Sequence, residues 1–150
     1  MAAYGLAYLE PILQRSDIWI SSKSEAKGLA GVTRLAIAAH QLSHYGPDVV
    51  MITLGKQGVF ILDHGRSSRV PAYPVDRVVD TTGTGDAFSA GVITGMLEGL
   101  PWMDSARLGC AVASIKVKYP GSRGGLPDRN QVQKIIEGDI MKPTVDEVQN

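Results

Sequence analysis

The sequence is poor in the features that mark several classes of protein. Its single cysteine, Cys110, cannot form a disulfide within the chain, which fits a reducing compartment. No apolar run approaches the roughly 20 residues of a spanning helix, and the first residues lack the basic segment of a secretory signal. With 15 basic and 15 acidic residues the net charge is zero, so no basic face for nucleic acid or membrane is expected. These absences predict a cytoplasmic domain with neither partner.

What the sequence contains is enough apolar material for a core of ordinary size, at 44% of 150 residues. Apolar runs and helical spacing alternate along the chain. Strands are expected at 17–20, 49–52, 59–62, up to about 70, and 75–79. Helices are expected at 6–13 with an interruption at Pro11, around 35–42, at 86–98, after Pro101 to about 117, and at 128–138. This alternation predicts an α/β layer fold with a mostly parallel sheet.

Local signals support several of these boundaries. The turn at Asp63-His64-Gly65 is typical of a hairpin. Asp128, with Gln131 three residues later, resembles the capping box of a helix start. The small residues Gly91 and Gly95 share a helical face with Ala87, which predicts close packing of that helix on the sheet.

The segment that carries chemistry is Asp80-Thr-Thr-Gly-Thr-Gly-Asp-Ala-Phe88. Gly83 and Gly85 allow a tight turn and leave backbone N–H groups bare. The predicted helix begins there, and its unpaired donors and positive dipole end favour an anion such as a phosphoryl group. Asp86 then lies where it could accept the proton of an alcohol that attacks the phosphate.

A second interpretation of the same segment stays open on physical grounds. A glycine-rich turn that ends in aspartate also serves as a simple strand-to-helix connection with a carboxylate in the first helical turn. The common phosphate-binding fingerprints do not decide the matter. The sequence has no P-loop, and Phe88 stands where a dinucleotide site has its third glycine.

The wider pattern resembles the second signature of the PfkB/ribokinase family of carbohydrate kinases. Residues 80–88 depart from its common form only at Thr84, where the family has alanine. Thr53-Leu-Gly-Lys-Gln-Gly58 is similar to the family turn that lines the nucleotide, and 121–127 resembles a later loop near adenine. The resemblance covers about residues 15–138. It implies the C-terminal, nucleotide-binding portion of a ribokinase-like three-layer α/β/α fold.

The resemblance also implies a role for individual residues. It makes Asp86 the catalytic base and makes Gly83, Thr84 and Gly85 the anion hole for the transferring phosphoryl group. It makes Asp80 and Thr82 the positions of a monovalent cation such as potassium. The implied contacts of ATP are Thr53, Gly55 and Gly58. Cys110 falls near the adenine side, although a small core residue on an apolar stripe is the alternative interpretation.

One position departs from the family in a way that touches the metal. The family has an Asn-x-x-Glu motif that organises Mg²⁺ near the phosphates, and this sequence has Ser22-Lys-Ser-Glu25. Glu25 is therefore an indirect Mg²⁺ position by resemblance, and the shorter Ser22 places its geometry in question.

Other polar residues are expected to have no part in the chemistry. His40 and His44 lie one helical turn apart without a third ligand, which indicates a solvated helix end. Lys116 and Lys118 are likewise expected to be solvated, with a basic side chain near bound ATP as the alternative interpretation.

The sequence predicts ATP-dependent phosphorylation of a hydroxyl of a sugar or sugar-like alcohol, with Mg²⁺. Residues 1–138 would be a partial kinase domain and 139–150 a tail. Family members are about twice as long, and their first half brings the β lid and most sugar contacts, so the chain alone is expected to be inactive. The acceptor stays open, with a six-carbon sugar or keto-deoxy sugar acid suggested by the family, which also allows a homodimer at full length. A non-catalytic nucleotide-binding module and a nucleoside or vitamin kinase are the alternatives.

Overall fold

The computed structural model describes residues 5–138, which fall into two compact units. The first unit contains residues 5–54 and 60–69, and the second contains 55–59 and 70–138. The tail predicted at 139–150 lies outside the described residues. No helix among residues 5–138 combines the length and the hydropathy needed to span a membrane.

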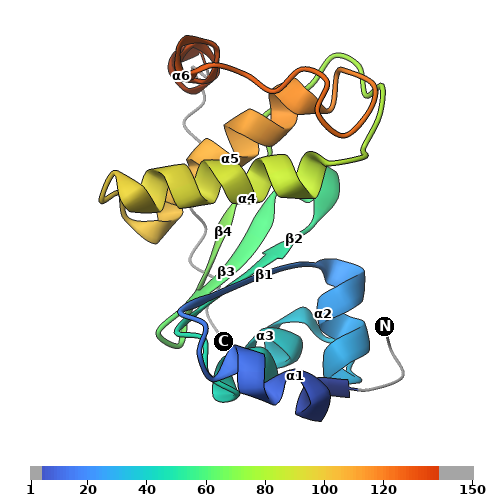
Figure 1. The fold of residues 1–150 in the computed structure, drawn as a ribbon, viewed down its shortest axis with the longest axis vertical. Helices are drawn as coiled ribbons and strands as arrows, with labels where there is room; N and C mark the ends of the chain where they lie inside the picture. Colours follow the sequence, from blue (N-terminus) through green and yellow to red (C-terminus); the bar gives the residue numbers. More distant parts are fainter. Residues whose placement is uncertain (1–4, 139–150) are drawn as a thin grey trace. The chain divides into compact units, whose positions relative to one another are not determined.

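The first unit is built on a four-stranded sheet with the strand order β1-β2-β3-β4 (Figure 1). Strands β1 and β2 are parallel, with Ile18 opposite Val49 and Ser22 opposite Thr53. The elements of this part are α1 (Gly5–Leu13), β1 (Ile18–Ser22), α2 (Lys23–Ala30), α3 (Leu35–His44), β2 (Val49–Thr53), β3 (Val59–Asp63) and β4 (Arg66–Val70).

The hairpin between β3 and β4 is confirmed, and its turn shows why these residues form it. His64 and Gly65 both have positive φ, 43° and 83°, as the two central residues of a tight hairpin turn require. The backbone N–H of His64 donates to the carbonyl oxygen of Asp48 at 3.0 Å, which ties the turn to the start of β2.

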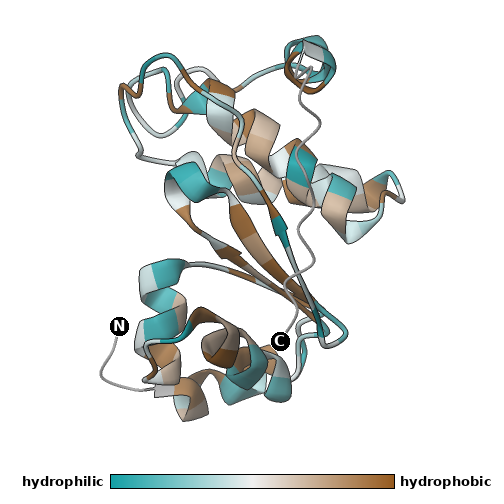
Figure 2. Ribbon diagram, turned by 180° about the vertical axis from the view of Figure 1, so that it is seen from behind, coloured by the Kyte–Doolittle hydropathy of each residue, from teal (hydrophilic) through white to brown (hydrophobic). Residues whose placement is uncertain are grey.

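The core of the first unit packs against one side of the sheet. Alternate strand residues Val50, Ile52, Phe60 and Leu62 meet helical residues Ala26, Ala38, Ala39 and Leu42 in one cluster. The intervening strand residues, among them Val49, Met51 and Ile61, are fully buried as well. Burial of both faces is the reason for continuous apolar runs in these strands, and Figure 2 shows the hydrophobic colour concentrated there.

Two expectations for the first unit need correction. Pro11 does not interrupt the first helix, because α1 continues through it to Leu13. Helix α2 was not anticipated from hydrophobic spacing, because only Ala26 among its residues is buried. A Ser-x-x-Glu pattern, which is a capping-box signal, marks its start at Ser22 and Glu25.

The second unit contains three α-helices, α4 (Thr84–Leu97), α5 (Trp102–Lys116) and α6 (Arg129–Gly138), and the short 3-10 turn η1 (Gly55–Gln57). All three helices were predicted within two residues of their observed bounds. The strand predicted at Val75–Val79 is wrong, because this segment has no regular structure. Val79 is 44% exposed, and its N–H and that of Asp80 both donate to the carbonyl oxygen of Val117, so the segment has no ladder partner of its own.

Helices α4 and α5 lie side by side because glycines allow their backbones to approach (Figure 1). A Cβ added at Gly91 would lie 2.7 Å from the Cα of Gly109, and one at Gly95 would lie 2.8 Å from the Cα of Ser105. The small face of α4 therefore packs on α5, and the prediction that it packs on the sheet is corrected. Larger residues at either glycine would separate the helices.

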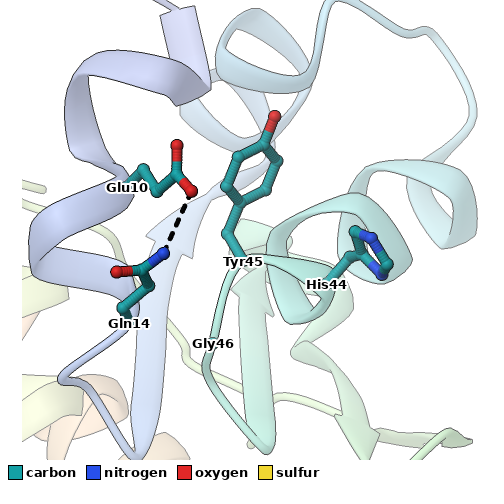
Figure 3. Close-up of a pocket in the computed structure, with 5 residues that line it drawn as sticks. All are labelled: Glu10, Gln14, His44, Tyr45 and Gly46. Carbon is teal, nitrogen blue, oxygen red and sulfur yellow. Dashed lines mark hydrogen bonds between the residues drawn. The ribbon is translucent and has the colours of Figure 1, made fainter.

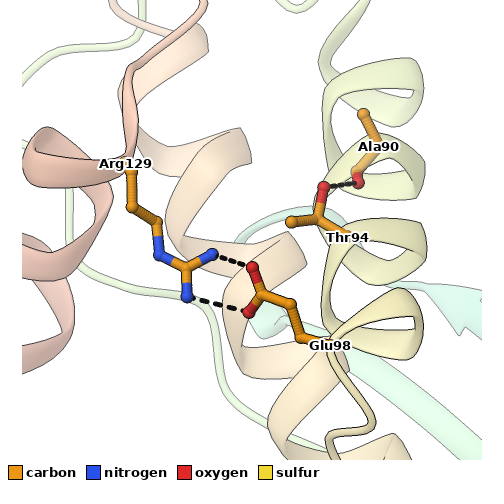
Figure 4. Close-up of polar contacts among 4 residues, drawn as sticks. All are labelled: Ala90, Thr94, Glu98 and Arg129. Carbon is orange, nitrogen blue, oxygen red and sulfur yellow. Dashed lines mark hydrogen bonds and ion pairs between the residues drawn. The ribbon is translucent and has the colours of Figure 1, made fainter.

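Helix α6 begins with the predicted capping box. The N–H of Asp128 donates to Gln131 Oε1, and the N–H of Gln131 donates to Asp128 Oδ1, both at 2.9 Å. Arg129 reaches α4, where its two terminal nitrogens donate to the two carboxylate oxygens of Glu98 (Figure 4). One turn before Glu98, the hydroxyl of Thr94 donates back to the carbonyl oxygen of Ala90 at 2.8 Å. The bidentate pair fixes the start of α6 beside the end of α4.

Candidate functional site

The turn before α4 is a helix N-terminus without a side-chain cap. Gly83 is the N-cap, with φ 74° and ψ 2°, and no side-chain hydrogen bond closes this end. The N–H of Thr84 donates to the carbonyl oxygen of Thr81 at 3.1 Å. The next two N–H groups, of Gly85 and Asp86, are among those that a helix leaves without an intrahelical partner. The turn therefore presents donors at the positive end of the helix dipole.

Glycine is present at the two positions of this turn for different structural reasons. At Gly83 the positive φ favours glycine, and an added Cβ would lie 2.5 Å from the carbonyl oxygen of Ser122. Gly85 lies inside α4 without a positive φ, and an added Cβ there would meet nothing within 4 Å. The expectation that both glycines serve a tight turn thus holds for Gly83 alone. Glycine at 85 keeps the surface in front of the helix end bare.

Asp80 joins this turn to the loop after α5. Its Oδ1 accepts the N–H of Thr82 and its Oδ2 accepts the N–H of Gly121, each at 2.8 Å. The hydrogen bonds from Thr82, the largest cause, together with that from Gly121, lower the pKa of Asp80 to about 2. The positive charge of Lys116 contributes as well. Asp80 is therefore a carboxylate at neutral pH, held between two backbone segments.

Lys116 is the residue of this region whose preferred sequence interpretation, a solvated side chain, is wrong. It was expected to be solvated, but it is 0% exposed, and its Nζ donates to the carbonyl oxygen of Asp80 at 3.3 Å. Lys118 fits the expectation better, because its Nζ pairs at 2.7 Å with the exposed Asp76. The available signal was the position of Lys116 on the buried stripe of α5, one residue before buried Val117.

Asp86 lies in the first turn of α4 with an exposed side chain. Within residues 5–138 its carboxylate has neither a hydrogen-bond nor an ion-pair partner. Its oxygens are thus available to an incoming hydroxyl group.

The remaining residues that were predicted to contact ATP belong to both units. Gly55 and Gly58, in the second unit, have φ 60° and 87°, and a Cβ on Gly58 would lie 2.0 Å from the carbonyl oxygen of Val70. Thr53 is in the first unit at the end of β2, where its hydroxyl donates to the carbonyl oxygen of Ser21 at 3.4 Å. Cys110 is 5% exposed, and burial raises the pKa of its thiol to about 12. Its surroundings are those of a core residue.

Glu25 and Ser22, in the first unit, form a reciprocal cap on α2. Glu25 Oε2 accepts the backbone N–H of Ser22 at 2.8 Å and its hydroxyl at 2.7 Å, and the N–H of Glu25 donates to Ser22 Oγ. The backbone hydrogen bond is the main cause that lowers the pKa of Glu25. Serine in place of asparagine is therefore a good helix cap.

The second unit brings together the predicted anion hole, the predicted base and the predicted cation positions Asp80 and Thr82. Within residues 5–138 no cluster of three or more His, Cys, Asp or Glu side chains is suited to a metal. His40 and His44 are exposed, as expected of a solvated helix end.

Two cavities lie away from this turn. In the first unit, a cavity of about 580 Å³ is lined by Glu10, Gln14, His44, Tyr45 and Gly46, and Figure 3 shows Gln14 donating to Glu10. In the second unit, about 400 Å³ lies among α4, α5 and α6, with residues such as Thr94, Val112 and Val132 on its walls. Neither contains a predicted site residue.

Comparison with solved structures defines the fold class. The ribokinase of Arabidopsis thaliana, solved in complex with ribose and ATP, matches 85% of this chain with a TM-score of 0.80 and 29% identity. The match confirms the predicted ribokinase-like α/β fold.

The family follows from the sequence comparisons. The model described as "pfkB family carbohydrate kinase" matches residues 6–129. The chain belongs to this family. It is 38% identical over 91 residues to the 2-dehydro-3-deoxygluconokinase of Bacillus subtilis, across 61% of its own length. It is 33% identical over 133 residues to the ribokinase of Haemophilus influenzae, across 85% of its length.

The chain spans less than half of the length of these relatives. It covers 28% of the Bacillus subtilis kinase, 43% of the Haemophilus influenzae ribokinase and 43% of the Arabidopsis thaliana structure. The rest of their length has no counterpart in these 150 residues.

Proposed function

We propose that these residues form the ATP-binding and phosphoryl-transfer part of a kinase that phosphorylates a hydroxyl of a sugar or a sugar-like alcohol. The observation that carries the proposal is the uncapped N-terminus of α4, where bare N–H groups, a bare Gly85 and an exposed Asp86 without a partner among residues 5–138 lie within one helical turn. The family membership and the relatives named as kinases support it.

In this mechanism the turn binds the phosphoryl group that is transferred. The N–H groups of Gly83 and Gly85, and that of Thr84 once it leaves the carbonyl oxygen of Thr81, would donate to its oxygens as negative charge develops on them, which is the main protein contribution to phosphoryl transfer. The absence of a Cβ at Gly85 leaves room for a phosphate oxygen next to the backbone.

Asp86 would act as the base. Its carboxylate is exposed and lies in the first turn of the same helix, so an acceptor hydroxyl that approaches the phosphate also approaches the carboxylate. As the hydroxyl oxygen forms its bond to phosphorus, its proton passes to Asp86, and ADP leaves with the electrons of the broken bond.

The other ligands of the reaction are proposed from the family. Mg²⁺ would arrive with ATP and neutralise phosphate charge, and Glu25 is the indirect position that the resemblance assigns to it. Thr53, Gly55 and Gly58 are the proposed contacts of the nucleotide, and Cys110, whose surroundings are those of a core residue, is the less favoured one. Asp80 and Thr82 are the proposed positions of a monovalent cation. We further propose that the full-length enzyme is a cytoplasmic homodimer with a small sugar as its substrate.

The 150 residues alone are proposed to bind ATP weakly and to leave sugars unphosphorylated. Phosphoryl transfer requires the acceptor to be held at attack distance from the phosphate, and more than half of the relatives' length is without a counterpart here. A non-catalytic nucleotide-binding module is the second candidate, which the same coverage favours.

Titration calorimetry of the purified chain with a non-hydrolysable ATP analogue and Mg²⁺ tests the proposal, beside an assay of ADP release with a panel of sugars. Binding without ADP release is the expected result. Absence of nucleotide binding would contradict the proposed function. The chain can then be mixed with the first half of the Haemophilus influenzae ribokinase, since turnover that depends on both pieces separates the kinase from the non-catalytic module.

A further inference from the structure

Lys116 is charged and fully buried, a combination that requires compensation. Burial removes the water around an ammonium group, which is costly unless the protein replaces those interactions. The interaction that replaces them here is the hydrogen bond from Nζ to the carbonyl oxygen of Asp80 at 3.3 Å. Lys116 is also the last residue of α5, where the negative end of the helix dipole favours a cation. If Lys116 only stabilised the fold, its replacement would not change the affinity for anionic ligands selectively.

The location of the ammonium connects it to the anion-binding turn. Asp80 lies three residues before Gly83, and all its polar groups are engaged. Its N–H donates to Val117, its carbonyl oxygen accepts from Lys116, and its carboxylate accepts from Thr82 and Gly121. The peptide that leads into the turn is therefore fixed from the end of α5.

The positive charge of Lys116 is compensated in part by the Asp80 carboxylate, whose pKa it helps to lower. The hydrogen bond of Nζ goes to a neutral carbonyl group, and both carboxylate oxygens of Asp80 accept backbone N–H groups. An anion bound at the N-terminus of α4 would add negative charge at the turn that follows Asp80. Because the ammonium is buried, its interaction with that charge is screened less than an interaction between two surface groups.

We propose that Lys116 is a positioning residue of the proposed phosphate turn (residues 81–85), whose buried ammonium both fixes the Asp80 peptide and supplies a positive charge that strengthens the binding of phosphate-bearing ligands. This inference rests on the proposed nucleotide site. It assigns to α5 an electrostatic part in that site, in addition to its packing against α4.

The test compares a charged ligand with a neutral one. Lys116→Met keeps the length and the apolar stem of the side chain and removes its charge. Lys118→Met removes the same charge from a surface pair two residues away, where Nζ meets exposed Asp76. Affinities for a non-hydrolysable ATP analogue and for adenosine are measured by titration calorimetry on the full 150-residue chain. Lys116→Arg, which keeps the charge, serves as the conservative rescue.

Lys116→Met should bind the ATP analogue about tenfold more weakly, with adenosine affinity within about twofold of the parent, since one buried charge acts on the phosphates and not on the neutral nucleoside. Lys118→Met should bind both like the parent, and Lys116→Arg should recover most of the lost affinity for the analogue. If circular dichroism shows that Lys116→Met is unfolded, Lys116→Gln, which can still donate to Asp80, replaces it with the same expectation.

Each of the following results would overturn the inference. Unchanged affinity of Lys116→Met for the analogue would show that the charge does not reach the phosphates. Equal losses for the analogue and adenosine would reduce Lys116 to a structural residue, as would unfolding of both the Met and the Gln variant. A parent chain that binds adenosine but not the analogue, or binds neither, would overturn the proposed phosphate site and with it this inference. Failure of the site is therefore seen in the parent chain, whereas failure of this inference alone is seen only in the Lys116 variants.

Discussion

Gly83 and Gly85, in the turn that we propose to bind phosphate, offer a way to separate folding from ligand binding. At Gly83, alanine must adopt a left-handed conformation, which costs an L-residue about 1–2 kcal/mol. Its Cβ would also lie 2.5 Å from the carbonyl oxygen of Ser122, and relief of such a backbone contact costs about 1–3 kcal/mol more. Gly83→Ala should therefore lower the free energy of unfolding by at least about 2 kcal/mol.

At Gly85 the same substitution should have the opposite effect on stability. This residue lies in α4 with ordinary backbone angles, and the new methyl group would meet nothing within 4 Å. Replacement of glycine by alanine within a helix raises the free energy of unfolding by about 0.5–1 kcal/mol. The methyl group would occupy the surface in front of the helix N–H groups, so affinity for an ATP analogue should fall at least about tenfold, or about 1.4 kcal/mol.

The assay needs a signal from the second unit alone. Trp102 begins α5 in that unit and Trp19 lies in β1 of the first, so a Trp19→Phe background leaves Trp102 as the fluorescent reporter. Thermal unfolding should shift down by about 4 °C or more for Gly83→Ala and up by about 1–4 °C for Gly85→Ala, on the scale of about 2–4 °C per kcal/mol. A destabilised Gly85→Ala, or one that binds the analogue like the parent, would refute the reasoning.

Further predictions concern the base, the cation and pH. In an assembled kinase that contains these residues, Asp86→Asn should lower turnover by about 100-fold or more with ATP affinity little changed; turnover within about twofold of the parent in a coupled ADP assay would rule the base out. If Asp80 and Thr82 hold a monovalent cation, potassium should raise that turnover more than lithium at equal ionic strength, and identical rates would argue against the site. The pKa of Asp80, lowered to about 2 chiefly by the Thr82 hydrogen bonds, makes its contribution to stability complete above the unfolded pKa of about 3.9 and lost as pH falls towards 2. Urea unfolding between pH 5 and pH 2 should therefore lose less stability for Asp80→Asn than for the parent, and parallel curves would contradict this.

Much of the fold could be predicted from the sequence, because several of its signals are local. The hairpin at His64-Gly65 follows from residues that tolerate positive φ. The start of α6 follows from Asp128 and Gln131, which exchange hydrogen bonds over three residues. The start of α4 follows from the glycine-threonine turn, and with it the position of Asp86. Each depends on groups within one turn of each other.

The features that the sequence did not disclose depend on distant parts of the chain. Val75–Val79 has the composition of a strand, but a strand also requires a partner, and here the N–H groups of Val79 and Asp80 meet the end of α5 instead. Gly91 and Gly95 indicated close packing, but the predicted partner, the sheet, was wrong, and the structure shows Gly109 and Ser105 of α5 instead.

The proposed phosphate turn also combines features that follow from the local sequence with features that depend on distant residues. Its donors, its bare Gly85 and its carboxylate Asp86 lie within one helical turn, so they follow from the local sequence. The family signature in residues 80–88 identifies the family for the same reason, because all its residues are close together in the chain. Tertiary structure alone decided that Asp80 would join two loops through Gly121 and that Lys116 would lie buried beneath it. Those contacts join residues 36 and 41 positions apart, and a lysine near a helix end looks solvated until the loop that covers it is placed.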